Sequence, residues 1–542
     1  MRNYLKSNWL YLIFLPVLTS VAYLNALTGG FVSDDRGAIL QNPNIGNFNW
    51  VLSAGFSFVQ PLIYFVIYSL AGLSAPLFHL LNLFLHLGIV LLVYTLVFLL
   101  SKKKNLAWIA AAIFAVHPIL TEAVTWISGV PYLLSAFFLL AGLIVYIEAK
   151  NSVKALAISA ILFLLALSSS NKAIVFFPLV LVYELSYGDV KKNWKRLTFF
   201  LTLTLVFFIS LIPAINLRII NVTGAPISAK SSVVNPLILI PFSVTTYLSL
   251  IFFPYKLSFY HTYGVIPMYQ FIFQLIVFIA FIIFILLMYR KNRNIFFWLS
   301  FFIIALLPAL TPFKIAWIVA ERYVYLGSIG IIAAVSYLIV WLWEQKKLKA
   351  VGYFMFVLIL LIFTFRTILR NFDWQNQDTL WIATAKTDPL SQLNHNNLGD
   401  MYGRHGDLQK ALQEFRVAIE LDPNYADAYH NLGNTYRQLH QDDKAIASYQ
   451  KALQIDPNLW QSHEELAGIY FEQKLYKEAL GEIKKAINIS PNSSLLYSNL
   501  GIIYLQLKDK SSAEQAFLKA LGLDPNNQIA KSAYIQIAGS GN

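Results

Sequence analysis

The residues with the most evident chemical potential are two adjacent acids near the N-terminus. Asp34 and Asp35 stand in FVSDDRGAILQNPNI, directly after the first long apolar stretch. One carboxylate could act as general base toward an acceptor hydroxyl while its neighbour orients it or raises its pKa. The same oxygens could instead bind a divalent cation, or the pair could form an Asx turn in a solvated loop. These alternatives stay open on the residues alone.

Acidic residues are scarce in the apolar part of the chain, where only eight precede residue 350. Four lie beside basic clusters, where solvation at a membrane interface explains them: Glu148, Glu184, Asp189 and Glu344. The other four lie at the predicted outer face of the membrane: Asp34, Asp35, Glu122 and Glu321. Charged groups at membrane depth are costly and usually functional. Glu122, in HPILTEAVTW, therefore requires a partner.

Basic residues in the same predicted outer loops suit an anionic ligand. Lys172 follows SSSN in a tight turn, and Lys314 and Arg322 lie in PFKIAWIVAERYVYLGS. A phosphate needs such donors, and arginine offers a bidentate fork. Glu321 is the neighbour of Arg322, and both could simply solvate the loop.

Aromatic and histidine side chains accompany these charges. Tyr323 follows Arg322, and His261 stands between tyrosines in KLSFYHTYG. Such rings suit stacking on a sugar or the ordinary aromatic belt of a membrane interface. His117 precedes Pro118, which is expected to kink the helix there. Its imidazole could be a ligand or a structural hydrogen-bonding group.

The elements that must position these residues follow from the composition. The chain has 542 residues, of which 57% are hydrophobic and 13% charged. This excludes a purely soluble enzyme and a disordered chain, and indicates a polytopic membrane protein. The absence of cysteine excludes disulfides, thiolate metal sites and a cysteine nucleophile. The sequence has no phosphate loop, GxSxG or HExxH motif.

Eleven apolar stretches are candidates for membrane-spanning helices. They are 9–26, 76–100, 105–120, 130–148, 154–170, 173–187, 197–216, 270–289, 295–310, 323–343 and 350–369. With the N-terminus inside, seventeen Lys and Arg fall in predicted cytoplasmic loops and seven outside before residue 350. A twelfth span at 237–253 would place Arg290–Arg293 outside, so that stretch is interpreted as a re-entrant or interfacial segment. We expect a multi-pass protein of the cell (plasma or inner) membrane, with its N-terminus in the cytoplasm.

Residues 371–542 form a polar part with a fixed period of 34 residues. Prolines recur at this step, as do a small residue (Gly399, Gly433, Ala467 and Gly501), a tyrosine (Tyr402, Tyr436, Tyr470 and Tyr504) and two alanine columns (Ala411, Ala445, Ala479 and Ala513; Ala418, Ala452, Ala486 and Ala520). Small residues allow two helices to pack closely, and the tyrosine is expected to fill the space between them. Such a pattern predicts a tetratricopeptide repeat (TPR) solenoid. The array is expected to bind polypeptide in its concave groove, or to serve as a spacer or dimerisation module.

The order of these segments resembles the transmembrane and tetratricopeptide-repeat O-mannosyltransferases and their prokaryotic relatives, in the GT-C superfamily of polyprenyl-phosphate-sugar-dependent glycosyltransferases. The resemblance rests on FVSDDRGAILQNPNI, APLFHLLNLFLHL, HPILTEAVTWISG, SSSNKAIVFFPLVLVYEL, AERYVYLGSIG and RNFDWQNQDTLW, followed by the repeats. It implies a catalytic acidic pair in the first outer loop, matched by Asp34 and Asp35. It also implies a site on the outer face, with the TPR domain on the same side.

The expected fold is all-α and has four parts. They are a GT-C-like membrane domain (1–370), a half repeat or linker (371–391), four TPR repeats (392–527), and a capping helix with a tail (528–542). The expected reaction moves a sugar, with mannose a candidate, from a polyprenyl-phosphate donor to Ser or Thr of a protein, with inversion. The TPR domain would present the acceptor.

The candidate site residues divide by role. Asp34 and Asp35 are the catalytic candidates, and would also be the ligands of a divalent metal if one is used. The candidates for binding the donor phosphate or sugar are Arg322, Lys172, Lys314, Glu122, His117, Glu321, Tyr323 and His261. No other cofactor is assigned. The expected partners are the lipid-linked donor, the acceptor polypeptide and membrane lipid, without nucleic acid.

Two other functions remain as alternatives. A membrane-anchored TPR scaffold for envelope protein assembly would need only one span. A transporter of lipid-linked sugars would place polar residues at mid-membrane in paired, broken helices.

Overall fold

The computed structural model describes residues 2–149, 152–224, 236–259, 261, 266–310 and 319–539. It divides into two compact units, one ending at Asp388 and one whose main part begins at Pro389. We name them the membrane unit and the repeat unit. The described chain is helical throughout apart from turns and one isolated bridge between His261 and Val319. The predicted all-α class is confirmed.

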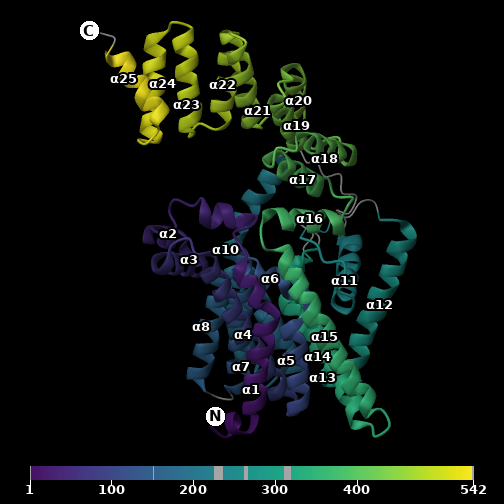
Figure 1. The fold of residues 1–542 in the computed structure, drawn as a ribbon. Helices are drawn as coiled ribbons and strands as arrows, with labels where there is room; N and C mark the ends of the chain where they lie inside the picture. The colour runs from purple at the N-terminus through teal and green to yellow at the C-terminus, as the bar shows by residue number, and fades with distance from the viewer. Residues whose placement is uncertain are drawn as a thin grey trace. The chain divides into compact units, whose positions relative to one another are not determined.

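The membrane unit is built from helices that run along a common direction (Figure 1). The longer ones are α1 (Arg2–Tyr23), α4 (Ala75–Ser101), α5 (Lys104–Val116), α7 (Val130–Glu148), α8 (Val153–Ser169), α9 (Phe176–Ser186), α10 (Trp194–Gly224), α11 (Pro236–Phe252), α12 (Met268–Lys291), α13 (Arg293–Leu306), α14 (Tyr325–Glu344) and α15 (Lys349–Asp373). Each of the eleven predicted spans coincides with one of these helices, and α11 covers the ambiguous stretch 237–253.

Not every one of these helices is long enough to cross a membrane alone. Within the described residues six are, and a seventh span results if the bent pair Lys104–Val116 and Pro118–Thr125 counts as one. The pair bends by 55°, at the position where Pro118 predicts a kink. At 1.5 Å per residue the 11-residue helix α9 is too short to span by itself. Eleven crossings and their orientation therefore stay predictions.

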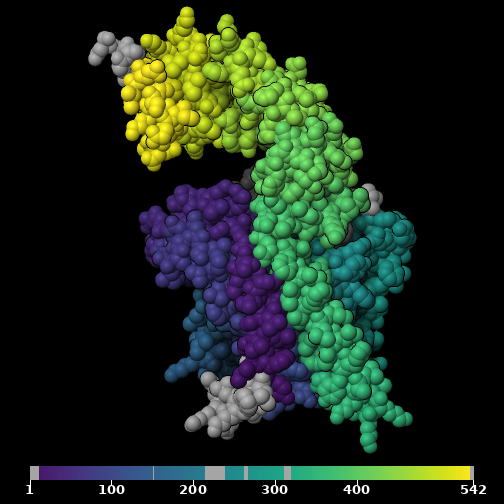
Figure 2. All heavy atoms as spheres, in the orientation of Figure 1, coloured from purple at the N-terminus to yellow at the C-terminus, as the bar shows by residue number. Residues whose placement is uncertain are grey.

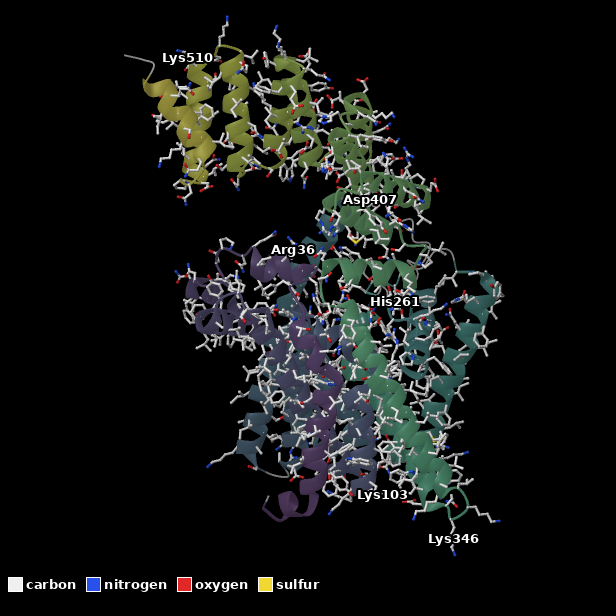
Figure 3. All side chains as sticks on the ribbon, in the orientation of Figure 1. Arg36, Lys103, His261, Lys346, Asp407 and Lys510 are labelled. Atoms are coloured by element: carbon white, nitrogen blue, oxygen red, sulfur yellow. The ribbon has the colours of Figure 1, made fainter. Side chains whose placement is uncertain are left out.

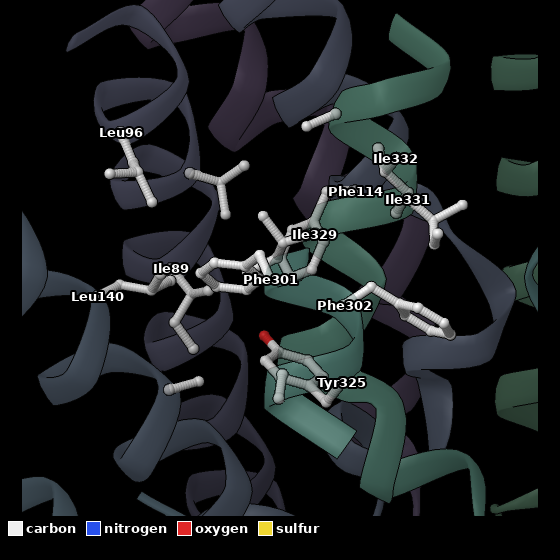
Figure 4. Packing of buried hydrophobic residues seen from close by; sticks show 14 of the residues in the cluster. Ile89, Leu96, Phe114, Leu140, Phe301, Phe302, Tyr325, Ile329, Ile331 and Ile332 are labelled. Atoms are coloured by element: carbon white, nitrogen blue, oxygen red, sulfur yellow. The ribbon is translucent and has the colours of Figure 1, made fainter. Parts of the chain in front are cut away.

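The helices pack around an extended apolar core. Figure 4 shows side chains of α4, α5, α7, α13 and α14 meeting there, with Ile89, Leu140 and Phe301 facing one another. Gly330 of α14 lies so close to the backbone of Trp298 on α13 that a methyl group has no room. α15 and α1, far apart in sequence, lie side by side along one face (Figure 2). This packing fixes the ends of the helices on which the polar residues stand.

The two ends of the membrane unit differ in their polar residues. Figure 3 places Lys103 and Lys346, members of predicted cytoplasmic clusters, at one end, and Arg36 and His261 at the other. At the first end Lys103 forms an ion pair with Glu344 at 2.7 Å. Lys103 and Lys346, from two different predicted clusters, thus lie at the same end of the unit. Which end faces the cytoplasm stays a prediction.

Two short helices after the acidic loop are an addition to the sequence analysis. They are α2 (Phe48–Ser53) and α3 (Val59–Ala71), and they lie at the same end as Arg36 (Figures 1 and 3). α3 has 13 residues, so it falls below the length used to recognise a span. A small apolar cluster packs these elements onto α4 and α7: Ile39, Ile45, Val59, Tyr64, Phe78, Ile127, Val130 and Leu134.

The membrane unit ends with α16 (Gln377–Thr387), which lies within the predicted half repeat 371–391. Residues 371–373 belong to the last turn of α15 instead. The side chain of Asn376 caps α16 by accepting hydrogen bonds from two backbone N–H groups of the first turn.

The repeat unit consists of helix pairs that follow one another in an array (Figure 1). The helices are α17 (Gln392–Arg404), α18 (Leu408–Leu421), α19 (Ala426–Gln438), α20 (Asp442–Ile455), α21 (Trp460–Glu472), α22 (Tyr476–Ile489), α23 (Ser494–Gln506), α24 (Lys510–Leu523) and α25 (Gln528–Gly539). They fit the predicted four repeats and a capping helix. In three of the repeats a ring from outside the tyrosine column packs on the small residue.

That ring comes from the second helix of each repeat. A methyl group on Gly433 would lie 2.6 Å from the ring of Tyr449. Gly399 and Gly501 face Phe415 and Phe517 in the same way. In the third repeat the small residue is Ala467, and Ile483 stands where the second helices of the other repeats carry a ring. The larger alanine is thus matched by a side chain without a ring.

Candidate functional site

The acidic loop is held in place by the segment that follows the last membrane helix. The backbone N–H of Gly30 donates to the carbonyl of Gln375 at 2.8 Å, and the Gln375 amide donates to the carbonyl of Asn25 at 2.9 Å. Asn371 donates to the carbonyl of Ala22 at 2.9 Å. The end of α1, which leads into the acidic pair, is therefore tied to residues about 350 positions later.

The two acids of the pair have opposite environments. Asp35 is fully buried, and its Oδ1 accepts from the backbone N–H of Ser128 at 2.7 Å and from the Ser128 hydroxyl at 2.5 Å. Its Oδ2 accepts from the N–H of Val32 at 3.0 Å. Asp34 is exposed, and Ser33 before it has a positive φ of 50°. The chain thus makes a left-handed turn at Ser33, directly before the two acids.

Burial dominates the electrostatics of Asp35. It raises the pKa of Asp35 from 3.8 to about 7, against the lowering effect of the hydrogen bonds from Ser128 and Val32. Asp34 adds a smaller repulsive contribution in the same direction. Asp35 therefore holds the loop through its hydrogen bonds, whereas the side chain of Asp34 is exposed to solvent.

Glu122 has the partner that its sequence context requires. It is fully buried, and its Oε2 accepts from the backbone N–H of Arg322 at 2.8 Å. Its Oε1 forms an ion pair with the guanidinium of the same residue. The guanidinium also lies near three rings, at 5.3 Å from Trp126, 5.7 Å from Phe259 and 5.1 Å from Tyr323. A buried pair of this quality fixes both side chains.

Lys172 is a buried cation of a different kind. Its Nζ lies 3.2 Å from the centre of the Tyr323 ring and 4.6 Å from that of Tyr132. Within the described residues this buried nitrogen has no hydrogen-bond acceptor. Burial lowers the pKa of Lys172 well below its ordinary value, and Arg322 lowers it further, while Glu122 opposes both. Such an ammonium is costly unless an anion completes its surroundings.

One short segment connects the acidic loop with the cations. In the stretch 121–132, Glu122 and Trp126 face Arg322, Ser128 binds Asp35, and Tyr132 lies under Lys172. Asn82 of α4 holds this stretch by donating to the carbonyl of Trp126 at 2.8 Å. Residues from four separate parts of the sequence are thus gathered around a single stretch of chain.

Glu321 belongs to a second charged group beside the first. It is fully buried and lies 3.5 Å from the guanidinium of Arg370 and 3.4 Å from Nε2 of His261. Arg370 also pairs with Asp373 at 2.9 Å. Because Glu321 and Arg322 are neighbours, the two groups form one continuous network.

Two further candidates have separate outcomes. His117 is buried with both ring nitrogens on backbone groups: Nδ1 accepts from the N–H of Ile119 at 3.2 Å and Nε2 lies 2.9 Å from the carbonyl of Ile251. This is the hydrogen-bonding alternative that the sequence left open, and it fixes the bend after α5. Lys314 lies outside the described residues.

Several side chains of the site were not singled out from the sequence. Ser128, Tyr132, Trp126 and Arg370 contact Asp35, Lys172, Arg322 and Glu321 respectively. Trp126, Ser128 and Arg370 stand in segments that the resemblance had marked, but without an alignment nothing distinguishes them there. An arginine in the last turn of an apolar helix is usually an interface residue.

The acidic pair does not offer a ready-made metal site. Both oxygens of Asp35 already accept hydrogen bonds, and Asp34 points into a different environment. No cluster of three potential His, Asp or Glu ligands occurs in the described part of the chain. The described residues around the acidic pair therefore do not fit a bound divalent cation.

The membrane unit also contains an apolar cavity of about 540 Å³. Residues of α5, α11, α14 and α15 line it, including Ile113, Ile251, Ile332 and Phe363. Its one charged lining residue is Arg366, one helical turn before Arg370. A groove of this kind accommodates a hydrocarbon chain whose charged end lies near the arginines.

Comparisons with known proteins address both units. Two family descriptions match the repeat unit: "Tetratricopeptide repeat" at residues 426–459 and 494–527, and "TPR repeat" at 399–439. The repeat unit is a TPR array. Among solved structures, a crystal structure of MamA is 23% identical over 29% of this chain and 84% of its own, with a TM-score of 0.25.

The longer matches extend through the membrane unit. Protein O-mannosyl-transferase TMTC3 of Mus musculus is 25% identical over 471 residues, which cover 76% of this chain and 51% of the relative. Protein O-mannosyl-transferase F38B6.6 of Caenorhabditis elegans is 26% identical over 76% of this chain and 63% of its own length. The chain is related to the TMTC-like protein O-mannosyl-transferases. It spans about half the length of the mouse relative.

Proposed function

We propose that the protein is an integral membrane glycosyltransferase of the GT-C type. It transfers a sugar, with mannose the first candidate, from a polyprenyl-phosphate donor to a Ser or Thr hydroxyl of a polypeptide. The observation that carries the proposal is the buried side-chain nitrogen of Lys172, which has no hydrogen-bond acceptor among the described residues and adjoins Arg322. The similarity to proteins named protein O-mannosyl-transferases supports the same reaction class.

The donor phosphate is assigned to Lys172 and Arg322. Lys172 supplies a buried amine to which no carboxylate of the described chain is hydrogen-bonded, and a bound phosphate would favour its charged form. Arg322 keeps N–H groups beyond those on Glu122, and the pair with Glu122 holds its fork in one orientation. A phosphate at this position satisfies the lysine, and the two basic side chains stabilise the negative charge that develops as the lipid phosphate leaves. Lys314 remains a candidate for the same role.

The general base is assigned to Asp34. Its carboxylate is exposed, whereas that of Asp35 is enclosed by Ser128 and Val32. Asp34 removes the proton from the acceptor hydroxyl while the hydroxyl oxygen bonds to the anomeric carbon. The bond from that carbon to the phosphate oxygen breaks, and its electron pair leaves with the lipid phosphate. One displacement inverts the anomeric configuration and leaves Asp34 protonated.

The remaining residues position these groups. Asp35 fixes the loop through Ser128, and Glu321 with Arg370 supports the backbone that carries Arg322. Tyr323 and Tyr132 shield Lys172 from water and offer ring faces to the sugar. His261 contacts this network through Glu321. The apolar cavity beside Arg366 is the place for the isoprenoid chain of the donor.

The topology of the proposal follows the loop charges. The site would lie on the extracytoplasmic face of the cell membrane, and the TPR array on the same side would present the acceptor polypeptide. Holding the acceptor in the groove raises its local concentration, so a weak contact at the site suffices.

The test uses membranes that contain the full chain, labelled polyprenyl-phosphate mannose and a protein acceptor. Asp34→Asn is expected to abolish transfer, and Lys172→Met to reduce it. Removal of residues 392–542 is expected to reduce transfer to proteins more than transfer to a short peptide. Full transfer by Asp34→Asn would reject the assigned base, and no labelled product from the wild-type protein with any polyprenyl-phosphate sugar would reject the reaction class.

A further inference from the structure

The first helices of successive repeats place one polar column along the groove of the TPR array. The column has a step of 34 residues and consists of Asn397, Asn431, Glu465 and Asn499. The amides of Asn431 and Asn499 each reach back to the preceding repeat, to Asn396 Oδ1 at 3.0 Å and to Glu464 Oε1 at 3.0 Å. A side-chain amide has both a donor and an acceptor, as has a peptide group. Such a column suits the backbone of an extended polypeptide.

A cavity of about 440 Å³ opens where this column is interrupted by Glu465. Helices α19, α21 and α23 provide most of its lining. One part of the wall is apolar, made by Phe471, Leu495 and Ile502, and Leu495 is 46% exposed. The lining also includes three acids: Glu464, Glu465 and Glu472. The cavity therefore combines an apolar surface with a carboxylate cluster.

The one cation of this cavity is already engaged. Arg437 forms ion pairs with Glu465 and, at 2.6 Å, with Glu472. It crosses Gly468, where an added methyl group would lie 3.2 Å from the guanidinium. Gly468 thus leaves room for Arg437 to bind both Glu465 and Glu472, which lie on either side of the glycine in the sequence.

Glu464 is left without a cationic partner in the cavity. Its one hydrogen bond in the described structure comes from Asn499. Partial burial raises the pKa of Glu464, and the neighbouring charge of Glu465 raises it further. A positive side chain placed here would relieve both effects, because it would supply the counter-charge that Arg437 cannot.

We infer that this cavity selects a polypeptide segment in which a Lys or Arg stands beside a bulky apolar residue. The basic side chain pairs with Glu464, and the apolar side chain lies against Leu495, Phe471 and Ile502. Asn431 and Asn499 contact the backbone on either side. The inference rests on the proposed function for the identity of this segment as part of the glycosylated acceptor.

The test measures peptide binding to the full chain in lipid nanodiscs, without donor. The probe is a short fluorescein-labelled Ser/Thr-rich peptide with one central Lys-Leu pair, compared with counterparts carrying Gln-Leu, Glu-Leu or Lys-Ser. We expect the Lys-Leu peptide to bind about tenfold more tightly than Gln-Leu, a difference of about 1.4 kcal/mol. Glu-Leu should bind most weakly.

Matched variants assign the preference to the cavity. Glu464→Gln keeps the oxygen that Asn499 reaches and is expected to remove the preference for Lys over Gln. Glu478→Gln removes one carboxylate from an exposed position on α22 and should leave the preference intact. Leu495→Ser changes an exposed side chain and should remove the preference for Leu over Ser. Circular dichroism checks that each variant keeps its helices.

The results separate this inference from the proposed function. Equal binding of the Lys-Leu and Gln-Leu peptides, or equal behaviour of Glu464→Gln and Glu478→Gln, would overturn the inference even if sugar transfer is observed. Selectivity that depends on Glu464 in a protein without transfer activity would support the groove assignment and reject the proposed reaction.

Discussion

The hydroxyl and the backbone N–H of Ser128 both donate to the same oxygen of Asp35, at 2.5 and 2.7 Å, across 93 residues of sequence. Together with the N–H of Val32 on the other oxygen, these bonds use Asp35 as a structural anchor. The adjacent acids are therefore not an equivalent pair. Asp35 holds the loop in position, and Asp34 is exposed to solvent.

The first prediction concerns Asp34. Asp34→Asn should lower transfer by about 10²–10⁴-fold, the range that a positioned general base contributes. It should leave thermal stability nearly unchanged, because the side chain is exposed. The measurement is the initial rate of sugar transfer in membranes, with the melting temperature of the purified protein as control. A normal rate at high pH would show that another group removes the proton.

The second prediction follows from the pKa of Asp35, which burial raises to about 7. Folding favours the protonated acid, so its contribution to stability is complete below pH 4 and is lost as the pH rises through 7. Wild-type stability should fall relative to Asp35→Asn by about 2–3 kcal/mol between pH 5 and pH 8. Unfolding of both proteins at matched pH values measures it. If the stability of both proteins changed with pH in the same way, the raised pKa of Asp35 would be contradicted.

The third prediction separates function from stability at Lys172. Lys172→Met keeps the length of the side chain and removes a buried charge that has no acceptor in the described structure. The variant should be as stable as the wild type or more stable, yet its apparent KM for the donor should rise at least about tenfold. Lys172→Arg should not restore the wild-type KM, since the tyrosine ring lies 3.2 Å from the ammonium. A large loss of stability in Lys172→Met would indicate a structural role.

The fourth prediction concerns the buried pair of Glu122 and Arg322. Glu122→Gln or Arg322→Met alone should destabilise the protein by about 3–5 kcal/mol, because one buried charge loses its partner. The double variant should recover much of this loss while its transfer activity stays low. Unfolding and transfer assays on all four proteins form a double-mutant cycle. Independent effects of the two substitutions would argue against the pair.

The fifth prediction compares two glycines of the repeat unit. Gly433→Ala should destabilise the array by about 1–3 kcal/mol, since the new methyl group would lie 2.6 Å from the ring of Tyr449. Gly481→Ala has no heavy atom within 4 Å and should stabilise its helix by about 0.5–1 kcal/mol. Thermal unfolding followed by circular dichroism distinguishes the two. Similar effects at both positions would contradict the packing described for Gly433.

The sequence predicted the helices better than the contacts between them. Helix positions follow from apolar runs and a fixed repeat, which are local properties, so α4 and α14 were placed to within a few residues. The pairing of Glu122 with Arg322 joins positions 200 residues apart, and no local pattern encodes it. For the same reason the sequence left open whether Asp34 or Asp35 is available to a substrate. The contact of Gly433 with the ring of Tyr449 was not predicted, because a period of 34 does not identify which residues of two helices face each other.

The stretch 121–132 determines how the residues of the site lie relative to one another. Its side chains contact different parts of the chain, through Glu122, Trp126, Ser128 and Tyr132. One residue more or less within it would rotate the following side chains away from their partners all at once. Evolution can therefore exchange amino acids here but has little freedom to change the length. Among relatives that keep the activity, insertions and deletions should accumulate in the loops around α2 and α3 and be missing between Glu122 and Tyr132.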